Sequence, residues 1–152
     1  MTQLNCATIE GTQLYQSRFP NAAPNHFRNQ QKLTLSSIGV GTYLGKPDDA
    51  TDTKYIQSIV RAVQLGSNVI DSAANYRFQR SERAIGKALV QLKELGFKRE
   101  EIVICTKGGY IPFDGAPPRN VREYIEETFV RTGIASFDDF VGGSHCMTPA
   151  YL

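Results

Sequence analysis

Three short apolar runs, each followed by a segment with helical periodicity, constrain the fold of this chain more than any other feature. The runs cover residues 38–42, 68–71 and 102–106, and each has the length and β-branched content of a buried strand. Parallel strands need a crossover of about a dozen or more residues between them, usually a helix. The spacing of the runs provides such crossovers, so the sequence predicts an α/β fold in which helices cover a parallel sheet.

Two segments that follow the first and second runs have the apolar periodicity of an amphipathic helix. The first is predicted to bury one face made of Ile56, Ile59, Val60 and Val63. The second, residues 81–95, is predicted to bury a face made of Ala84, Ile85, Ala88, Leu89, Leu92 and Leu95. Gly66 and Gly96 follow these segments. They are predicted to end the helices, because glycine readily adopts the left-handed conformation found at helix C-termini.

The N-terminal part differs in composition from the rest of the chain. Residues 1–36 are rich in Asn, Gln, Thr and Pro, and we expect them to form an arm that precedes the sheet. Within this arm, residues 4–9 and 32–35 alternate between apolar and polar side chains. These two stretches are predicted to pair as a small hairpin.

The part that follows the third run begins with a loop rich in glycine and proline, residues 108–118. Asn120 and Glu123 then have the spacing of a capping box, which predicts the start of a helix. The side chains of this helix that are predicted to face inward are Val121, Tyr124, Ile125 and Phe129. Residues 133–152 have no clear periodicity and are expected to be irregular.

Two architectures share this order of strands and helices. In a doubly wound dinucleotide fold, glycines of the first run would open a phosphate-binding turn and Asp71 would hold a ribose. However, Gly39, Gly41 and Gly45 are spaced G-x-G-x-x-x-G, and a proline and two acids separate them from the next helix. The glycines therefore do not lead into the helix N-terminus. A (β/α)₈ TIM barrel explains Gly39 and Gly41 as strand positions where close packing requires glycine. We therefore predict that this chain forms the N-terminal part of such a barrel.

Length places a limit on how much of a barrel is present. A complete (β/α)₈ barrel takes about 250 residues, whereas this chain has 152. We therefore expect residues 37–152 to be an incomplete barrel of three βα units, truncated before the fourth strand of the barrel.

Asp71, Tyr76 and Lys107 carry the candidate chemistry. Asp71 ends the second run, Tyr76 follows it by five positions, and Lys107 comes directly after the third run. Because the carboxyl ends of parallel strands open on one face, we expect these side chains to converge there. A carboxylate, a phenol and an ammonium together form an acid catalyst in outline, because an ammonium favours the phenolate of a neighbouring tyrosine. Each residue also has a purely structural interpretation. Asp71 could cap a turn, Tyr76 could be a half-buried packing residue, and Lys107 could be a solvated side chain.

The residues around this cluster resemble the first half of an aldo-keto reductase. The matching motifs are G-V-G-T at 39–42, N-V-I-D-S-A at 68–73 followed by Tyr76, S-E-R-A-I-G-K-A-L at 81–89 and T-K-G-G at 106–109. The resemblance spans residues 33–109 and implies NAD(P)H-dependent reduction of an aldehyde or ketone to an alcohol. It also implies that Tyr76 is the general acid, that Lys107 assists it and that Asp71 is the counter-ion of Lys107.

The same resemblance implies the cofactor. NADP(H) is expected, with NAD(H) as the alternative, and no metal; Thr42 and Asp71 are the expected neighbours of the nicotinamide. The family's fourth catalytic residue is a histidine in a Leu-His-x-Pro setting, which this sequence lacks. His26 lies in the arm, and His145 stands beside Cys146 in a glycine-containing segment. Two adjacent residues do not readily bind one metal ion, so we interpret His145 and Cys146 as ordinary loop residues.

Charge and hydrophobicity restrict the partners. The net charge is +2 and 41% of the residues are hydrophobic, which is typical of a globular protein without a nucleic-acid or membrane partner. No apolar run approaches the roughly 20 residues of a membrane span. The densest basic cluster is interpreted as a solvated helix start and consists of Arg77, Arg80 and Arg83.

The cysteines indicate the compartment. Three are present and they lie far apart: Cys6, Cys105 and Cys146. An odd number at such spacing does not suggest a disulfide framework, so a reducing, cytoplasmic location is predicted.

Two functional hypotheses follow. The first is reduction of a small-molecule carbonyl by a full-length parent protein with Tyr76 as proton donor, while the present chain alone is inactive. The second is a non-catalytic truncated α/β fragment or a small dinucleotide-binding module, which uses an open sheet edge to bind a partner. The oligomeric state does not follow from either hypothesis.

Overall fold

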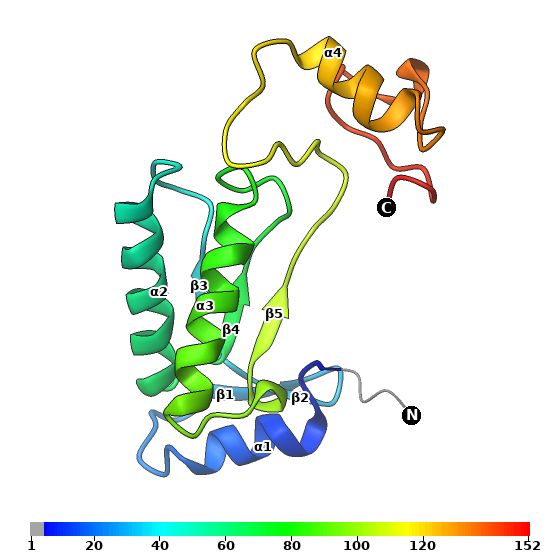
Figure 1. Cartoon of the computed structure of the whole chain (residues 1–152). Helices are drawn as coiled ribbons and strands as arrows, with labels where there is room; N and C mark the ends of the chain where they lie inside the picture. Colours follow the sequence, from blue (N-terminus) through cyan, green and yellow to red (C-terminus); the bar gives the residue numbers. More distant parts are fainter. Residues whose placement is uncertain (1–4) are drawn as a thin grey trace.

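The structure is a computed structural model that describes residues 5–152. A parallel sheet with two long helices beside it occupies the middle of the molecule (Figure 1). The helices and strands are, in chain order, α1 (Ile9–Ser17), β1 (Phe27–Gln30), β2 (Leu33–Ser36), β3 (Gly39–Gly41), α2 (Asp49–Gln64), β4 (Val69–Asp71), α3 (Arg80–Glu94), β5 (Val103–Cys105) and α4 (Val121–Ile125). Short 3₁₀ turns lie at Arg99–Glu101 and Phe137–Asp139, and a π turn at Glu126–Val130.

The central sheet contains three parallel strands in the order β3-β4-β5. Gly39 pairs with Val69, which pairs with Val103, so the three strands end at the same edge. Helices α2 and α3 form the crossovers between the strands and pack against each other (Figure 1). The predicted parallel sheet with helical crossovers is confirmed, whereas its extension into a barrel stays a prediction.

The core lies between this sheet and its helices. Its buried side chains are Tyr15, Ile59, Val63, Ile70, Ile85, Ala88, Leu92 and Ile102. Gly66 and Gly96 have φ angles of 105° and 84°, which confirms their predicted place after the two helices. Leu95 was predicted to be buried but is 50% exposed, because α3 ends at Glu94 and Leu95 caps it.

The N-terminal arm contains a helix that the sequence did not predict. Helix α1 begins at Ile9, and the hydroxyl of Thr8 accepts a hydrogen bond from the Gly11 amide at 3.0 Å. A Cβ atom at Gly11 would clash with the Glu100 carbonyl, so glycine allows α1 to pack closely against the 3₁₀ turn at Arg99–Glu101. The helix lies at the end of the sheet where the strands begin (Figure 1).

The hairpin in the arm has a different first strand from the one predicted. Strands β1 and β2 pair antiparallel, with Phe27 opposite Ser36. The predicted strand at 32–35 therefore overlaps β2, but its predicted partner at 4–9 is wrong. Residues 5–8 form no strand and Ile9 starts α1, while residue 4 lies outside the described residues.

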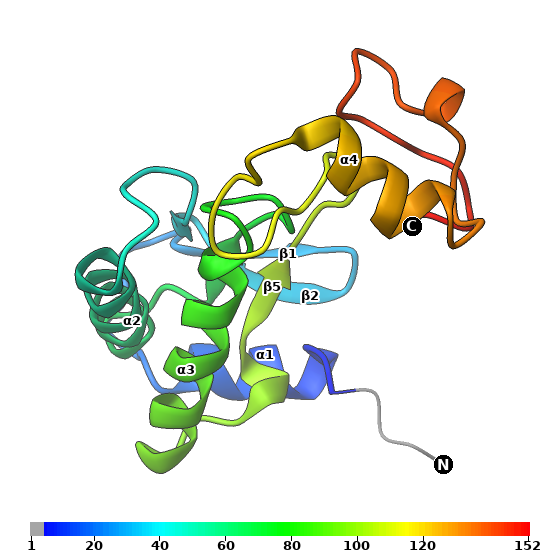
Figure 2. The same ribbon diagram turned by 45° about the horizontal axis from the view of Figure 1, so that its top comes forward.

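Residues 109–152, here called the C-terminal lobe, lie apart from the parallel sheet (Figure 2) and have a small core of their own. The buried members are Ile111, Ile125, Phe140 and Cys146, surrounded by partly buried aromatic side chains. The Asn120 side chain accepts from the Glu123 amide at 3.2 Å and caps α4. This is one half of the predicted capping box; the described residues show no return hydrogen bond from the Glu123 side chain to the Asn120 amide. Val121, predicted to face inward, is 40% exposed, because it is the first residue of α4 and lies beyond the edge of this cluster.

Candidate active site

The edge of the sheet where the strands end carries the three predicted catalytic residues. Asp71 is the last residue of β4 and pairs in register with Cys105, the last residue of β5. Lys107 follows β5 by two positions, and Tyr76 lies in the turn between β4 and α3. Parallel pairing brings Asp71 and Lys107 together, as the sequence predicts, and the turn after β4 places the Tyr76 ring beside Lys107.

Lys107 and Asp71 form an ion pair. The Lys107 Nζ atom lies 2.8 Å from Asp71 Oδ1 and also donates to the Ser72 carbonyl at 2.6 Å. The Lys107 and Asp71 side chains are 49% and 52% exposed. The hydrogen bond to the Asp71 carboxylate is the main reason why the pKa of Lys107 lies above its usual value. The ammonium is therefore held in its charged form.

The ring of Tyr76 completes the cluster. Lys107 Nζ lies 5.2 Å from the centroid of this ring, which is within the range of a cation–π interaction. On another side, the ring of Tyr43 meets Tyr76 edge to face with centroids 4.9 Å apart. Tyr76 is half-buried, whereas Tyr43 is 65% exposed. The phenol is thus oriented by an ammonium and by a second aromatic ring.

Thr42 supports the cluster from inside the sheet. Its side chain is fully buried, and its hydroxyl contacts the Asp71 carbonyl at 3.1 Å and the Ser72 hydroxyl at 3.0 Å. The Thr42 carbonyl accepts from the Ser81 hydroxyl at 2.6 Å, which ties β3 to the start of α3. The structure therefore places Thr42 behind Asp71, where it holds the strand ends together.

Tyr43 and Ser72 also belong to this cluster but were not predicted from the sequence. Tyr43 directly follows Thr42 at the end of the first predicted strand, and this position was the signal that could have identified it. Ser72 contributes its carbonyl to Lys107 and its hydroxyl to Thr42. Its signal was its position beside Asp71 at a strand end.

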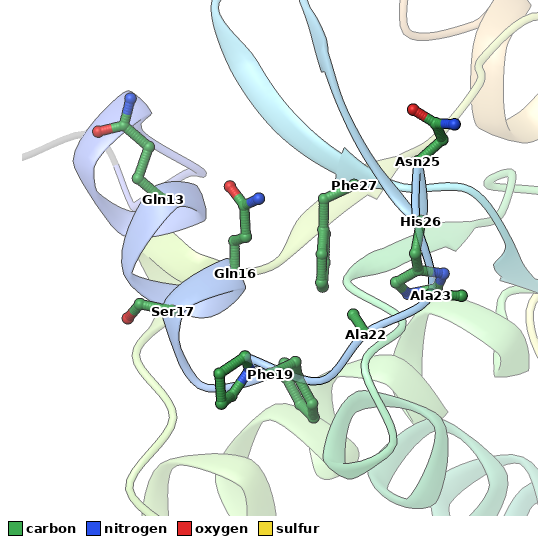
Figure 3. Close-up of a pocket in the computed structure, with 10 residues that line it drawn as sticks. Gln13, Gln16, Ser17, Phe19, Ala22, Ala23, Asn25, His26 and Phe27 are labelled. Carbon is green, nitrogen blue, oxygen red and sulfur yellow. The ribbon is translucent and has the colours of Figure 1, made fainter.

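The two histidines lie elsewhere. The ring of His26 contacts the Gly66 carbonyl at 3.0 Å and the Ser37 hydroxyl at 3.1 Å, in the segment that leads into β1 (Figure 3). His145 belongs to the C-terminal lobe, where its ring packs edge to face on Tyr110 with centroids 4.7 Å apart.

A cavity of about 410 Å³ lies beside His26, far from the three candidate residues. It is formed by the end of α1 and the segment that leads into β1, with Gln16, Phe19 and Phe27 around it (Figure 3). The residues that line this cavity all lie between 13 and 27, whereas Asp71 ends β4 and Lys107 follows β5, so the cavity is separate from the candidate site.

The strand-end edge fits the reactive end of a nicotinamide cofactor. The Asp71 carboxylate is half-exposed, and a Cβ atom placed on Gly41 would meet no atom within 4 Å, so there is open space beside β3. The N-terminus of α2 does not fit a pyrophosphate. The Asp48 carboxylate already accepts from the Thr51 amide there, and Asp49 and Asp52 make the first turn acidic. This acidic turn argues against the doubly wound alternative.

Two further properties concern the described residues as a whole. Across residues 5–152, no helix combines the length and apolarity needed to cross a membrane. The same residues contain no group of three or more His, Cys, Asp or Glu side chains arranged to hold a metal ion.

Comparison with known proteins identifies the family. Residues 37–141 match the Aldo/keto reductase family. This match covers more than half of the chain, and the chain therefore belongs to the aldo-keto reductase family.

Individual relatives agree with this assignment. The chain is 30% identical over 129 residues to the NADH-specific methylglyoxal reductase of Escherichia coli K12, a match that covers 72% of this chain and 38% of the relative. It is 40% identical over 78 residues to the aldo-keto reductase YhdN of Bacillus subtilis, covering 49% of this chain and 22% of the relative. The chain thus spans well under half of the curated relatives that it matches.

One solved structure shows a partial likeness. It is a Pseudomonas aeruginosa protein assigned to the aldo-keto reductases, with a TM-score of 0.45 and 26% sequence identity. The comparison covers 78% of this chain and 47% of the Pseudomonas chain.

Proposed function

We propose that the protein to which this chain belongs reduces a small aldehyde or ketone to an alcohol with a nicotinamide cofactor, and that Tyr76 donates the proton. The observation that carries the proposal is the position of Lys107. Its ammonium contacts the Asp71 carboxylate at 2.8 Å and lies 5.2 Å from the centroid of the Tyr76 ring. An ammonium in this position stabilises the phenolate that remains after proton donation.

In the proposed reaction, each residue has a separate task. When bound, the nicotinamide supplies the hydride that adds to the carbonyl carbon. Tyr76 gives its phenolic proton to the carbonyl oxygen, which becomes the alcohol, and the phenolate regains a proton from water. Lys107 balances the transient negative charge, and Asp71 keeps Lys107 in place and protonated. Thr42 holds the backbone of Asp71.

Cofactor and substrate are proposed from the family and the named relatives. We propose NADP(H) as the cofactor, as the family resemblance implies. NAD(H) is the alternative, because the name of the E. coli relative describes an NADH-specific enzyme. That same name makes methylglyoxal the first aldehyde to test. Thr42 and Asp71 are proposed to lie closest to the nicotinamide, Asp71 by direct contact and Thr42 through the backbone that it supports.

Tyr76→Phe tests the proton donor. In the full-length protein, this change should lower carbonyl-dependent oxidation of NADPH or NADH by about 10²–10⁴-fold, because the general acid is lost while the ring remains. Cofactor binding, followed by fluorescence titration, should stay close to wild type. Tyr110→Phe is the matched control, because Tyr110 is 55% exposed in the C-terminal lobe. This variant should have the turnover of the wild type. Undiminished turnover in Tyr76→Phe would remove Tyr76 from the mechanism.

A second candidate is a non-catalytic chain that binds a partner along its sheet. The observation that favours it is the sheet order, because β3 and β5 are both edge strands in the described part of the chain. Unpaired parallel edges attract further strands. In this case, residues 1–152 expressed alone should associate through these edges, which size-exclusion chromatography would show. A monodisperse chain would exclude this candidate.

A further inference from the structure

We propose that Arg77 is a positioning residue, and that its buried guanidinium clamps the strained turn that holds Tyr76 against Lys107. This inference rests on the proposed function for its meaning, because it concerns how the proton donor is presented. The dependence of the Tyr76–Lys107 contact on Arg77 can be measured without any enzymatic turnover.

The turn between Tyr76 and α3 has an unusual backbone. Arg77, Phe78 and Gln79 have φ angles of 50°, 58° and 68°, so three consecutive residues with side chains adopt the left-handed conformation. Such residues visit this region singly and at an energetic cost, whereas glycine adopts it readily. The local sequence does not favour this turn, so contacts with other segments have to maintain it.

Arg77 makes the strongest of these contacts. Its Nε and Nη2 atoms donate to the Lys46 carbonyl at 3.0 and 2.8 Å, and Nη2 donates to Asp52 Oδ1 at 2.5 Å. The guanidinium also lies over the Tyr55 ring, 5.0 Å from its centroid. Only 1% of the Arg77 side chain is exposed, so the earlier interpretation of this arginine as part of a solvated helix start was wrong. The rigid, planar fork of arginine suits such a set of partners.

The other two residues of the turn reach the segment that follows Lys107. Gln79 Nε2 donates to the Pro112 carbonyl at 2.6 Å, and the Phe78 carbonyl accepts from the Gly115 amide at 2.9 Å. The turn is therefore fastened on one side to the loop and helix that follow β3, and on the other side to the loop that follows β5. Because Tyr76 directly precedes it, its shape sets where the phenol lies relative to Lys107.

Arg83 provides a matched control. It lies on α3 near the same end of the molecule and forms an ion pair with Asp114 at 2.6 Å. Its side chain is 53% exposed, and exposed pairs of this kind contribute little to stability. If a buried clamp is what matters, removing Arg77 and removing Arg83 should have different consequences.

The experiment measures the Tyr76–Lys107 contact by NMR in the full chain with carbon-13-labelled lysine. In wild type, the ring current of Tyr76 should displace the ε-methylene signals of Lys107. The variant Lys107→Arg assigns these signals, because they disappear in it. The variant Tyr76→Leu should abolish their displacement, because it removes the ring. Arg77→Met should lose most of this displacement while far-UV circular dichroism shows an intact fold. Arg77→Lys should restore it only in part, because an ammonium cannot bridge Lys46 and Asp52 as a fork does. Arg83→Met should keep it in full.

A second variant covers the case in which Arg77→Met does not fold. Asp52→Asn removes the carboxylate that Arg77 shares with Arg80 and keeps the shape of the Asp52 side chain. It should reduce the displacement of the Lys107 signals. An unchanged displacement in folded Arg77→Met would overturn the proposal, as would an unchanged displacement in Asp52→Asn. Because the measurement needs no cofactor or substrate, a chain without turnover still gives a decisive result. Failure of the proposed function and failure of this inference are therefore separate outcomes.

Discussion

The parallel-sheet core and the C-terminal lobe are built in different ways. The core buries aliphatic side chains at regular helical and strand spacing, with Ile59, Ile85 and Leu92 at 3% exposure or less. The lobe depends on aromatic packing between irregular segments, for example Phe129 with Phe140 and Tyr151 at centroid distances of 5.7 and 5.1 Å. Regular elements can be recognised one at a time, whereas a cluster of this second kind exists only once distant segments have met.

Each region contains a tyrosine whose hydroxyl is buried, and the two hydroxyls differ in their hydrogen bonds. Tyr15 is fully buried in the core, and its hydroxyl donates to the Val63 carbonyl at 2.5 Å. The hydroxyl of Tyr151 in the lobe is also buried, but it has no hydrogen-bond partner among the described residues. A buried polar group without a partner is costly. Of these two hydroxyls, the one in the core therefore has its hydrogen bond and the one in the lobe does not.

The largest expected effect separates the two regions directly. Leu92→Ala in the core should lower the free energy of unfolding by about 2–5 kcal/mol, and Phe140→Ala in the lobe by about 3–5 kcal/mol, because both leave cavities. Hydrogen exchange should then show that Leu92→Ala exposes amides throughout α2 and α3. Phe140→Ala should expose only residues 109–152. Equal loss of protection in α2 and α3 for both variants would mean that the regions unfold as one unit.

The paired tyrosines give the next largest difference. Tyr15→Phe should destabilise the core by about 0.5–1.5 kcal/mol, because the Val63 carbonyl loses its hydrogen bond from the Tyr15 hydroxyl and keeps only that from the Gly66 amide at 3.3 Å. Tyr151→Phe removes an unpartnered hydroxyl and should be neutral or slightly stabilising. Urea denaturation of the two variants beside wild type provides the measurement. Similar losses in both would show that the Tyr151 hydroxyl has a partner in solution.

Alkaline pH should act on the lobe through the same tyrosine. Burial is the main reason why the pKa of Tyr151 is raised to about 12 in the folded protein, whereas an unfolded tyrosine has a pKa of about 10. The folded state therefore keeps a proton that the unfolded state loses. This contribution is complete below pH 10 and is lost as pH rises towards 12.

Thermal unfolding of the lobe, followed between pH 9 and pH 12, should accordingly depend less steeply on pH in Tyr151→Phe than in wild type. The exposed Tyr110 serves as control, since Tyr110→Phe should retain the wild-type slope. Identical slopes in all three proteins would contradict the assignment of this effect to Tyr151.

The smallest effect concerns the site between the two regions. The Asp71 carboxylate raises the pKa of Lys107, so Asp71→Asn should bring that pKa back towards its ordinary value. Because the pKa is raised on folding, the stabilisation from this pair is present below the ordinary lysine pKa of about 10.4 and lost above it. Titration of the Lys107 ε-methylene signals by NMR gives the measurement. Asp114→Asn, which removes the exposed partner of Arg83, should leave the Lys107 titration unchanged.

Much of the core was predictable because its signals are local. The periodicity at Ile59, Val63, Ile85 and Leu92 predicted two helices, and all four residues are buried. Helix α1 gave no comparable signal, since the residues that it buries are Gly11, Thr12 and Tyr15. Its position depends on close approach to the turn at Arg99–Glu101, which lies far away in the sequence.

The candidate site also has a part that could be predicted from the sequence and a part that could not. Parallel pairing alone places Asp71 and Lys107 at neighbouring strand ends, so their approach followed from the spacing of the apolar runs. The orientation of Tyr76 did not follow, because three left-handed residues come directly after it and none of them is glycine. Their conformation is maintained by the Lys46 carbonyl and the Asp52 carboxylate, which contact Arg77 only in the folded chain.

By itself, therefore, the sequence determined the parallel α/β arrangement, the helix ends at Gly66 and Gly96, and the strand-end positions of Asp71 and Lys107. Hydrophobic periodicity and glycine conformation act over a few residues, which is why these features can be read locally. Only the tertiary structure decided the burial of Arg77, the position of α1 and the aromatic cluster of the lobe. Each of these depends on contacts between segments that no local preference specifies, and their energy exists only when the segments pack together.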